Sequence, residues 1–197
     1  MASVDAAVPG QSIGRAHGRS PAAYTRTMEP QPSDRHTRID VPADPRDLPG
    51  TFCKRFVVEV RFGDTDAMGH ANNSRFLTYC ESARIDYWAA ATGEPFALAT
   101  HGAEESLILA EARVAFRSPA MFGEVLTVET RASRIGRTSF GLEHRLTAGA
   151  SEHGPARLVA IAEDVLVLYD YANARPRPIP DDLAARIEAY EGRRLRE

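Results

Sequence analysis

The chain has 197 residues, of which 43% are hydrophobic and 26% are charged, a composition ordinary for a globular protein with one core. A formal net charge of −3 gives no broad electrostatic attraction to nucleic acid or to an anionic membrane, so neither partner is expected. No apolar run approaches the roughly 20 residues that a membrane-spanning helix needs.

The cysteines and basic residues exclude other classes of protein. Cys53 and Cys80 do not form a CxxC pair or a zinc-ligand spacing. Two free thiols in a chain without a secretory signal fit a reducing compartment, and we expect a cytoplasmic location. Lys54 is the only lysine, so nearly all positive charge is arginine, and no single arginine stands out as a phosphate ligand on composition alone.

Residues 1–50 differ from the rest of the chain. They hold seven of the thirteen prolines and show no apolar periodicity. Such a composition buries too little apolar surface to offset the loss of chain entropy on folding. The sequence therefore predicts a disordered N-terminal tail at 1–50.

The first structured segment begins as a strand and continues as a helix. The predicted strand is Phe56–Phe62, where β-branched and aromatic residues are interspersed with polar ones. After a turn-rich loop, a helix is predicted from Ser74 to Ala91, because apolar residues recur there at three- and four-residue steps. Asn72 or Asn73 is the expected N-cap, and the glycine at position 93 is expected to end the helix.

Four more strands follow an irregular connector at 96–104. Apolar residues alternate with polar ones in the first three, and the fourth is almost continuously apolar, as a central strand covered on both faces would be. The predicted strands are Leu107–Arg117, Glu124–Arg134, Ser139–Thr147 and Ala156–Tyr169. The last part, 173–197, is predicted to hold a proline-rich spacer and a short helix, Asp181–Arg193.

The resulting order β-α-β-β-β-β predicts an α+β architecture in which one antiparallel sheet buries one long helix. This order and two sequence blocks resemble the hotdog-fold acyl-CoA thioesterases of the 4-hydroxybenzoyl-CoA thioesterase type. The first block reads DTDAMGHANN at 64–73 and continues with FL at 76–77 and ESAR at 81–84. The second reads FRSPA at 116–120, with RIGRTSF at 134–140.

The resemblance implies a five-stranded antiparallel sheet wrapped around one long helix, in a thioesterase domain at 51–172. It implies that Asp66, the second acid of the turn, is the catalytic carboxylate, as nucleophile or general base. The backbone N–H of Asn73, at the helix start, would donate to the thioester oxygen. It also implies a homodimer or homotetramer with the acyl site at the subunit seam, and no metal ion or redox cofactor.

The residues between Asp66 and Asn73 are expected to support the site. Gly69 permits a close backbone approach or a positive φ, Asn72 caps the helix and shapes the pocket, and His70 assists water or orients the acyl group. Plant acyl-carrier-protein thioesterases have a similar turn in which an asparagine stands where this chain has Met68. Their version of the catalytic machinery is therefore not carried over intact.

Two arginines and a glutamate have competing interpretations. Arg134 and Arg137 flank a predicted turn and are candidate ligands for the phosphates of CoA, or else solvated turn residues. Glu81 lies on the helix. It is interpreted as an ion-pair partner of Arg84 or of a basic group across a dimer seam, rather than as a catalytic acid.

Two other interpretations of the acidic residues in this turn have less support from the sequence. Asp64 is interpreted as a structural turn residue. Asp64, Asp66 and His70 together could ligate a divalent ion, but no further ligand cluster accompanies them.

The predicted function is hydrolysis of an acyl-CoA thioester, or of an acyl-carrier-protein thioester, to a free acid and a thiol. A carboxylate that is ionised at pH 7 can attack a thioester carbon or activate water, while free N–H groups at a helix N-terminus stabilise the oxyanion. The alternatives are a protein of the same fold that binds the thioester without cleaving it, a hotdog hydratase or dehydratase, and a metal-dependent hydrolase.

Overall fold

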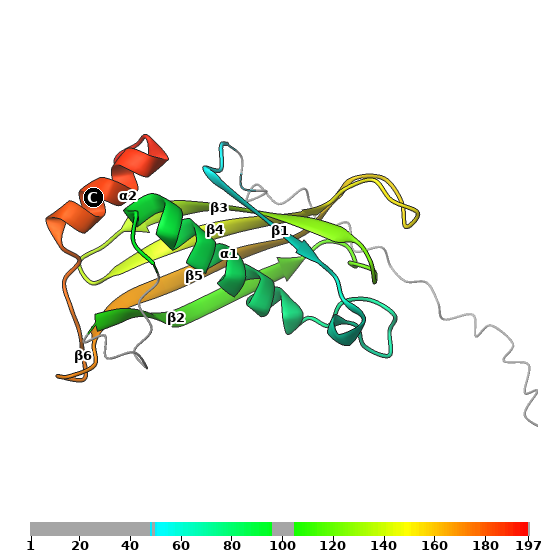
Figure 1. The fold of residues 1–197 in the computed structure, drawn as a ribbon, viewed down its shortest axis with the longest axis horizontal. Coiled ribbons are helices and arrows are strands. Elements are labelled where there is room, and N and C mark those ends of the chain that lie inside the picture. Colours follow the sequence, from blue (N-terminus) through cyan, green and yellow to red (C-terminus); the bar gives the residue numbers. More distant parts are fainter. Residues whose placement is uncertain (1–47, 49, 96–104, 197) are drawn as a thin grey trace, which may run out of the picture. The chain divides into compact units, whose positions relative to one another are not determined.

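The computed structural model describes residue 48 and residues 50–95 and 105–196, which form an antiparallel sheet packed against one long helix (Figure 1). The order of the long elements is the predicted one. The strands are β1 Lys54–Glu59, β2 Glu105–Phe116, β3 Val125–Ile135, β4 Ser139–Ala148, β5 Arg157–Asp170 and β6 Arg175–Pro176. The helices are α1 Arg75–Thr92 and α2 Asp181–Glu191, and a 3-10 turn covers Phe62–Asp64.

The sheet has the strand order β1-β3-β4-β5-β2, and every neighbouring pair is antiparallel. The β5 strand is internal, as its apolar sequence indicated. The short β6 pairs with the end of β5 at Tyr169 and Asp170. The sequence predicts a spacer in that segment, because two residues that end in proline carry no strand periodicity. The edge strand β2 is twelve residues long and has β5 on one side.

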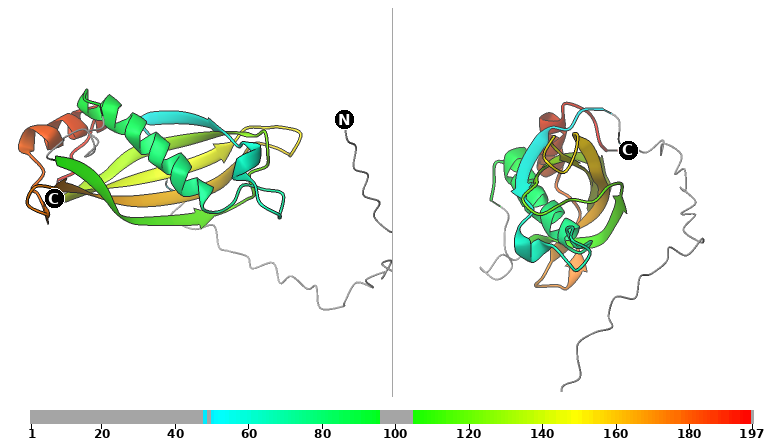
Figure 2. Two further views of the ribbon diagram at one scale, coloured as in Figure 1. Left: turned by 60° about the horizontal axis from the view of Figure 1, so that its bottom comes forward. Right: turned by 90° about the vertical axis from the view of Figure 1, so that its right-hand side faces the viewer.

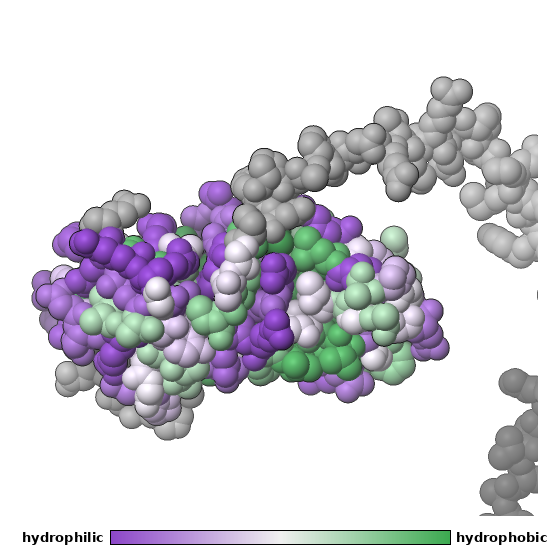
Figure 3. Space-filling model, turned by 90° about the horizontal axis from the view of Figure 1, so that it is seen from above, coloured by the Kyte–Doolittle hydropathy of each residue, from purple (hydrophilic) through white to green (hydrophobic). Residues whose placement is uncertain are grey.

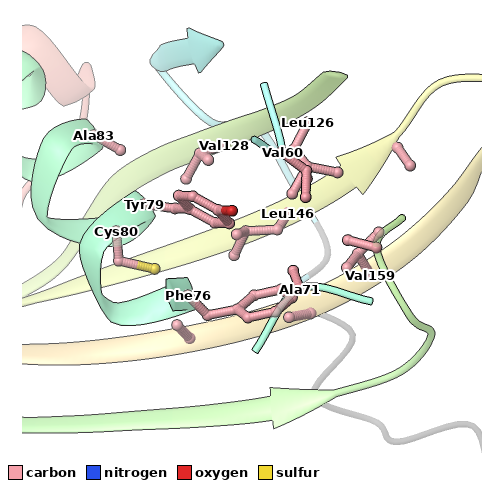
Figure 4. Close-up of a cluster of buried hydrophobic side chains, with 14 residues drawn as sticks. Val60, Ala71, Phe76, Tyr79, Cys80, Ala83, Leu126, Val128, Leu146 and Val159 are labelled. Atoms are coloured by element: carbon pink, nitrogen blue, oxygen red, sulfur yellow. The ribbon is translucent and has the colours of Figure 1, made fainter. Parts of the chain in front are cut away.

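Helix α1 lies across one face of the sheet, as Figures 1 and 2 both show. Its buried side chains Phe76, Tyr79 and Cys80 pack in one cluster with Val128 and Leu146 of the sheet (Figure 4). The helix is amphipathic because these residues recur at steps of three and four. This packing fixes where the N-terminal end of α1 lies, and therefore where the loop that precedes the helix must end.

A charged group also lies in the interface between α1 and the sheet. Arg84 donates to the Asp164 carboxylate of β5 over 2.5 Å, and both side chains are buried. His144 Nε2 lies 3.2 Å from the same carboxylate oxygen, and its Nδ1 lies 2.9 Å from the Thr130 hydroxyl. The expected pairing of Glu81 with Arg84 is therefore wrong: Arg84 points inward to Asp164, where a buried carboxylate needs a counter-charge.

Most element ends differ from the predicted boundaries by one to three residues, and two of these differences have a clear cause in the contacts. The first strand ends before Arg61, since the Asp64 carboxylate accepts the Arg61 N–H over 3.0 Å and turns the chain into the 3-10 segment. The N-cap of α1 is Ser74, and neither asparagine occupies that position. Asn72 acts just before the helix instead, where its Oδ1 accepts the Ser74 N–H over 2.9 Å. Gly93 ends the helix as predicted, with φ +73°.

Beyond β6, the C-terminal helix α2 covers the end of the sheet where β3 ends (Figure 1). Its Leu183 and Ile187 are buried with Tyr87 and Ala91 of α1. The predicted tail at 1–50 lies outside the described residues except for Leu48 and Gly50, and Leu48 packs with Phe52 and Ile161. No helix in the described part of the chain is long and apolar enough to cross a membrane.

Candidate active site

The loop at 64–73, called the site loop below, joins the 3-10 turn to α1. Its backbone folds back on itself: the Asp66 N–H donates to the His70 carbonyl over 3.1 Å, and the Gly69 N–H donates to the Asp66 carbonyl over 3.0 Å. Gly69 has φ +81°, a conformation that a residue with a Cβ rarely adopts. The expected positive φ at this glycine is therefore present, and it makes the tight turn that returns the chain to Asp66.

The Asp66 carboxylate is held by two hydrogen bonds from its own loop. Its Oδ1 accepts the Met68 N–H over 2.9 Å, and its Oδ2 accepts the Asn72 side-chain amide over 2.9 Å. Asp66 is only partly buried, so it is in part accessible to solvent. Asn72 thus contacts Asp66 through its Nδ2 and the helix start through its Oδ1, and it fixes the carboxylate relative to α1.

The backbone N–H of Asn73 is the open donor at the start of α1. The Ser74 N–H donates to the Asn72 side chain, and the Arg75 and Phe76 N–H groups donate to the carbonyls of residues 72 and 73. Among the described residues no acceptor is found for the Asn73 N–H. Because it lies beside the positive end of the helix macrodipole, this N–H is suited to receive a developing negative charge.

His70 and Asp64 have different surroundings. His70 is half-buried, and its Nδ1 lies 3.3 Å from the Ala71 carbonyl.

Asp64 is buried. Burial alone would raise the pKa of its carboxyl, but hydrogen bonds from the Arg61 backbone and guanidinium hold that pKa below its usual range. Burial, followed by the charge of Asp64, raises the pKa of Tyr79 to about 12. Asp64 thus anchors the loop, which is the structural role that the sequence predicts for it.

Arg134 and Arg137 lie at the other end of the sheet from the site loop. They line a cavity of about 440 Å³ together with Pro178, Ile179 and Arg196. β3 begins beside the end of β1, near the site loop, and its eleven residues span about 30 Å. Within one chain, these arginines therefore lie far from Asp66, whereas Asn72 and Asn73 lie close to it.

Exposed apolar side chains lie in the site loop and next to it in the sequence. Phe62 and Met68 are 79% and 76% exposed, and the Phe62 ring packs edge-to-face on Phe122 at 6.1 Å between centroids. On the face drawn in Figure 3, the most hydrophobic surface is gathered toward one end, while the surface toward the other end is mostly hydrophilic. Within the described residues, no group of three or more His, Cys, Asp or Glu side chains is arranged to hold a metal ion.

The sequence patterns did not predict several polar contacts in the interior. His144 stood on the apolar face of its strand pattern and Asp164 interrupted an apolar strand, and a polar residue at such a position signals a buried partner. Glu124 and Arg157, described below, carry no comparable signal, since each lies where a strand begins next to a turn, a place where charged residues are ordinary.

A sequence model of the thioesterase-like superfamily matches residues 60–187, which is more than half of the chain. The chain belongs to the thioesterase-like superfamily. A 1,4-dihydroxy-2-naphthoyl-CoA hydrolase of Synechococcus elongatus is 27% identical to it over 124 residues, which cover 63% of this chain and 87% of that protein.

Solved structures support the same membership. A thioesterase from Thermus thermophilus, complexed with coenzyme A and zinc, is 34% identical, with a TM-score of 0.60, and covers 73% of this chain and 98% of its own. A variant of 4-hydroxybenzoyl-CoA thioesterase in complex with 4-hydroxybenzoyl-CoA has a TM-score of 0.61 at 20% identity, covers 68% of this chain and 97% of its own, and shows the fold alone. The predicted hotdog fold, family and acyl-CoA thioesterase activity are confirmed.

Proposed function

We propose that Asp66 is the catalytic carboxylate of this thioesterase and that the Asn73 N–H stabilises the oxyanion. The observation that carries the proposal is the position of the Asp66 carboxylate. Two hydrogen bonds hold it just ahead of α1, one of them from Asn72, the neighbour of the residue that offers the open N–H. A positioned carboxylate and a positioned donor are the two groups that thioester hydrolysis requires, because a thiolate leaves without strong acid assistance.

The two routes open to Asp66 differ in the bond that forms first. As a general base, Asp66 takes a proton from water, whose oxygen bonds to the carbonyl carbon. As a nucleophile, an Asp66 oxygen bonds to that carbon and forms an anhydride, which water then hydrolyses. In both routes the C–S bond breaks, the thiolate of CoA leaves and is then protonated, and the Asn73 N–H donates to the carbonyl oxygen while it carries negative charge.

The other residues of the site loop take supporting roles in the proposal. Asn72 orients the Asp66 carboxylate through its amide, and Gly69 provides the turn that returns the chain to Asp66. His70 contributes its half-buried ring to the wall of the acyl site. These roles predict graded effects of substitution, with the largest effect at Asp66.

We further propose that the enzyme is at least a dimer and that Arg134 and Arg137 bind the phosphates of CoA for the partner's Asp66. The long edge strand β2 supports this assembly, since antiparallel pairing of two copies along β2 would place the arginine end of one sheet near the site loop of the other. The Synechococcus elongatus relative is named for an aromatic acyl-CoA, so aryl-CoA esters are the first substrates to assay. Two free cysteines support a cytoplasmic location.

Substitution of Asp66 tests the chemistry. We expect Asp66→Asn and Asp66→Ala to lower kcat by about 10²- to 10⁴-fold, because each removes the base or nucleophile. Thiol release from a panel of acyl-CoA esters measures turnover. Asp86→Asn is the matched control, since Asp86 lies on α1 and pairs with Lys54 at 3.1 Å. Wild-type turnover in both Asp66 variants would refute the assignment.

Isotope labelling separates the two routes. After many turnovers in ¹⁸O-water, a nucleophilic Asp66 acquires the label in its carboxylate, because water releases the anhydride by attack at either carbonyl carbon. A general base does not acquire it. Mass spectrometry of the peptide that contains Asp66 reads the outcome.

A further inference from the structure

The site loop is docked on a second turn, at 118–124, that joins β2 to β3. The Ala71 N–H donates to the Ala120 carbonyl over 2.7 Å, and His70 and Met121 form an isolated antiparallel bridge. These contacts fall between Asp66 and Asn73 in the sequence. The position of the 118–124 turn therefore determines where the returning half of the site loop lies.

Glu124 holds that turn in place from inside. Its side chain is almost fully buried, and its carboxylate accepts hydrogen bonds from three residues. Arg157 donates to both oxygens, over 2.9 and 2.6 Å, in a bidentate pair. The Met121 N–H donates to Oε2 over 2.8 Å, and the Ser151 hydroxyl donates to Oε1 over 2.9 Å.

Arg157 extends the same network to the other side of the turn. Its Nη2 also donates to the Pro119 carbonyl over 2.7 Å, so one guanidinium contacts the turn both directly and through Glu124. The two backbone positions on either side of Ala120, the Pro119 carbonyl and the Met121 N–H, are thus both held by this charged pair. Ala120, between them, is the residue that accepts the hydrogen bond from the site loop.

We propose that Glu124 and Arg157 are positioning residues for the thioesterase reaction, acting through the 118–124 turn on the returning half of the site loop. The proposal rests on the proposed roles of Asp66 and Asn73 in that loop. Neither Glu124 nor Arg157 touches the reacting atoms. A displacement of about 1 Å in such a supporting contact is sufficient to lower a rate by orders of magnitude, because reacting groups require close alignment.

The test compares Glu124→Gln and Arg157→Lys with a matched pair elsewhere. Glutamine keeps the size of Glu124 and removes its charge, and lysine keeps the charge of Arg157 and removes the bidentate fork. Glu143→Gln and Arg131→Lys are the controls, since Arg131 donates to Glu143 over 2.7 Å between β3 and β4, and both side chains are largely buried. We expect kcat to fall by about tenfold or more in the first pair, with KM within about twofold, and both constants to stay near wild type in the controls.

Amide hydrogen exchange of the peptide covering 64–73 gives an independent readout that does not depend on which residue carries the chemistry. Glu124→Gln should speed exchange at the Ala71 N–H, while Glu143→Gln should not. Unchanged exchange in this peptide together with unchanged kcat in a folded Glu124→Gln or Arg157→Lys protein would overturn the proposal. Wild-type turnover of Asp66→Asn, measured in parallel, would instead refute the catalytic assignment and leave the exchange result to decide the positioning role.

Discussion

At the scale of single residues, Asn73 separates the contribution of a side chain from that of the backbone. Its side chain is exposed, while its N–H is the open donor before α1 among the residues that the structure describes. Asn72 has the opposite character, because its side chain contacts both Asp66 and Ser74 and its N–H already donates to the Asp64 carbonyl. Two neighbouring asparagines thus serve the site in different ways.

Substitution of Asn73 tests this distinction directly. We expect Asn73→Ala to retain kcat within a few-fold, since alanine keeps the N–H. Asn73→Pro removes the N–H, and we expect it to lower kcat by about 10²- to 10³-fold, the usual effect of losing one oxyanion donor. Thiol-release kinetics measure both, and thermal unfolding checks that the proline variant is folded. Equal kcat in the two variants would show that the N–H is not used.

The Glu124 carboxylate also predicts how stability changes with pH. Hydrogen bonds from Arg157, above all, lower its pKa from 4.5 to about 2. A carboxyl whose pKa is lower in the folded state stabilises the fold above its unfolded pKa, and this contribution is lost as pH falls toward the folded pKa.

We therefore expect the difference in unfolding free energy between wild type and Glu124→Gln to be largest above pH 5. It should shrink by roughly 3 kcal/mol between pH 5 and pH 2. Urea unfolding of both proteins across this range measures the difference. A difference that stays constant down to pH 3 would show that Glu124 does not titrate with the fold.

At the scale of elements, the placement of α1 on the sheet depends on polar as well as apolar contacts. The Arg84 guanidinium crosses from the helix to Asp164 on β5, and His144 of β4 contacts the same oxygen. Burial would raise the pKa of Asp164, but the hydrogen bond and charge of His144 and the charge of Arg84 hold it below its usual range. We infer that this pair fixes the register of α1 on the sheet, because it can form at only one place along the helix, whereas apolar contacts are interchangeable.

Removing one member of this pair should be strongly destabilising. We expect Arg84→Met to lower the free energy of unfolding by about 3–5 kcal/mol, because it leaves the Asp164 carboxylate buried without its cation. The double variant Arg84→Met/Asp164→Leu should recover most of that loss. Asp182→Asn, which breaks an exposed pair with Arg186 on α2, should change stability by about 1 kcal/mol or less. Urea unfolding compares the three, and an equal loss in the single and double variants would contradict the argument.

The elements show what the sequence could and could not predict. Periodicity placed α1 and the five long strands to within a few residues, because each buries one continuous apolar face. It missed the inward direction of Arg84, since a helical arginine beside a glutamate also fits a surface pair. It missed the exact start of α1, because Asn72 and Ser74 are equally good capping residues until the side-chain contacts are known.

The candidate site also contains both residues whose proximity the sequence predicted and residues whose contribution it did not predict. Asp66, Gly69, Asn72 and Asn73 form one continuous motif, so their proximity followed from the sequence. Glu124 and Arg157 reach the site only through a turn that is distant in sequence, a relation that no local pattern carries.

At the scale of the whole molecule, the two parts of the proposed substrate site lie at opposite ends of one sheet. The site loop precedes α1 at one end, and the turn between β3 and β4, with Arg134 and Arg137, lies at the other beside α2 (Figure 1). Within one copy, β3 separates the two parts by about 30 Å. In the proposed dimer, two copies related by a two-fold axis bring these parts together, because each copy supplies one end to the other.

Subunit complementation tests this arrangement. Asp66→Asn and Arg134→Glu/Arg137→Glu should each lose most activity toward an acyl-CoA ester, the first in kcat and the second in KM. When the two variants are co-expressed, a mixed dimer holds one site with an intact Asp66 from one chain and intact arginines from the other. Random pairing makes half of the dimers mixed, each with one of its two sites restored, so we expect about a quarter of the wild-type turnover. An acyl thioester of N-acetylcysteamine, which lacks phosphates, should show no KM effect of the arginine changes. If co-expression restores nothing beyond the sum of the separate variants, the arginines and Asp66 do not share a site across the subunits.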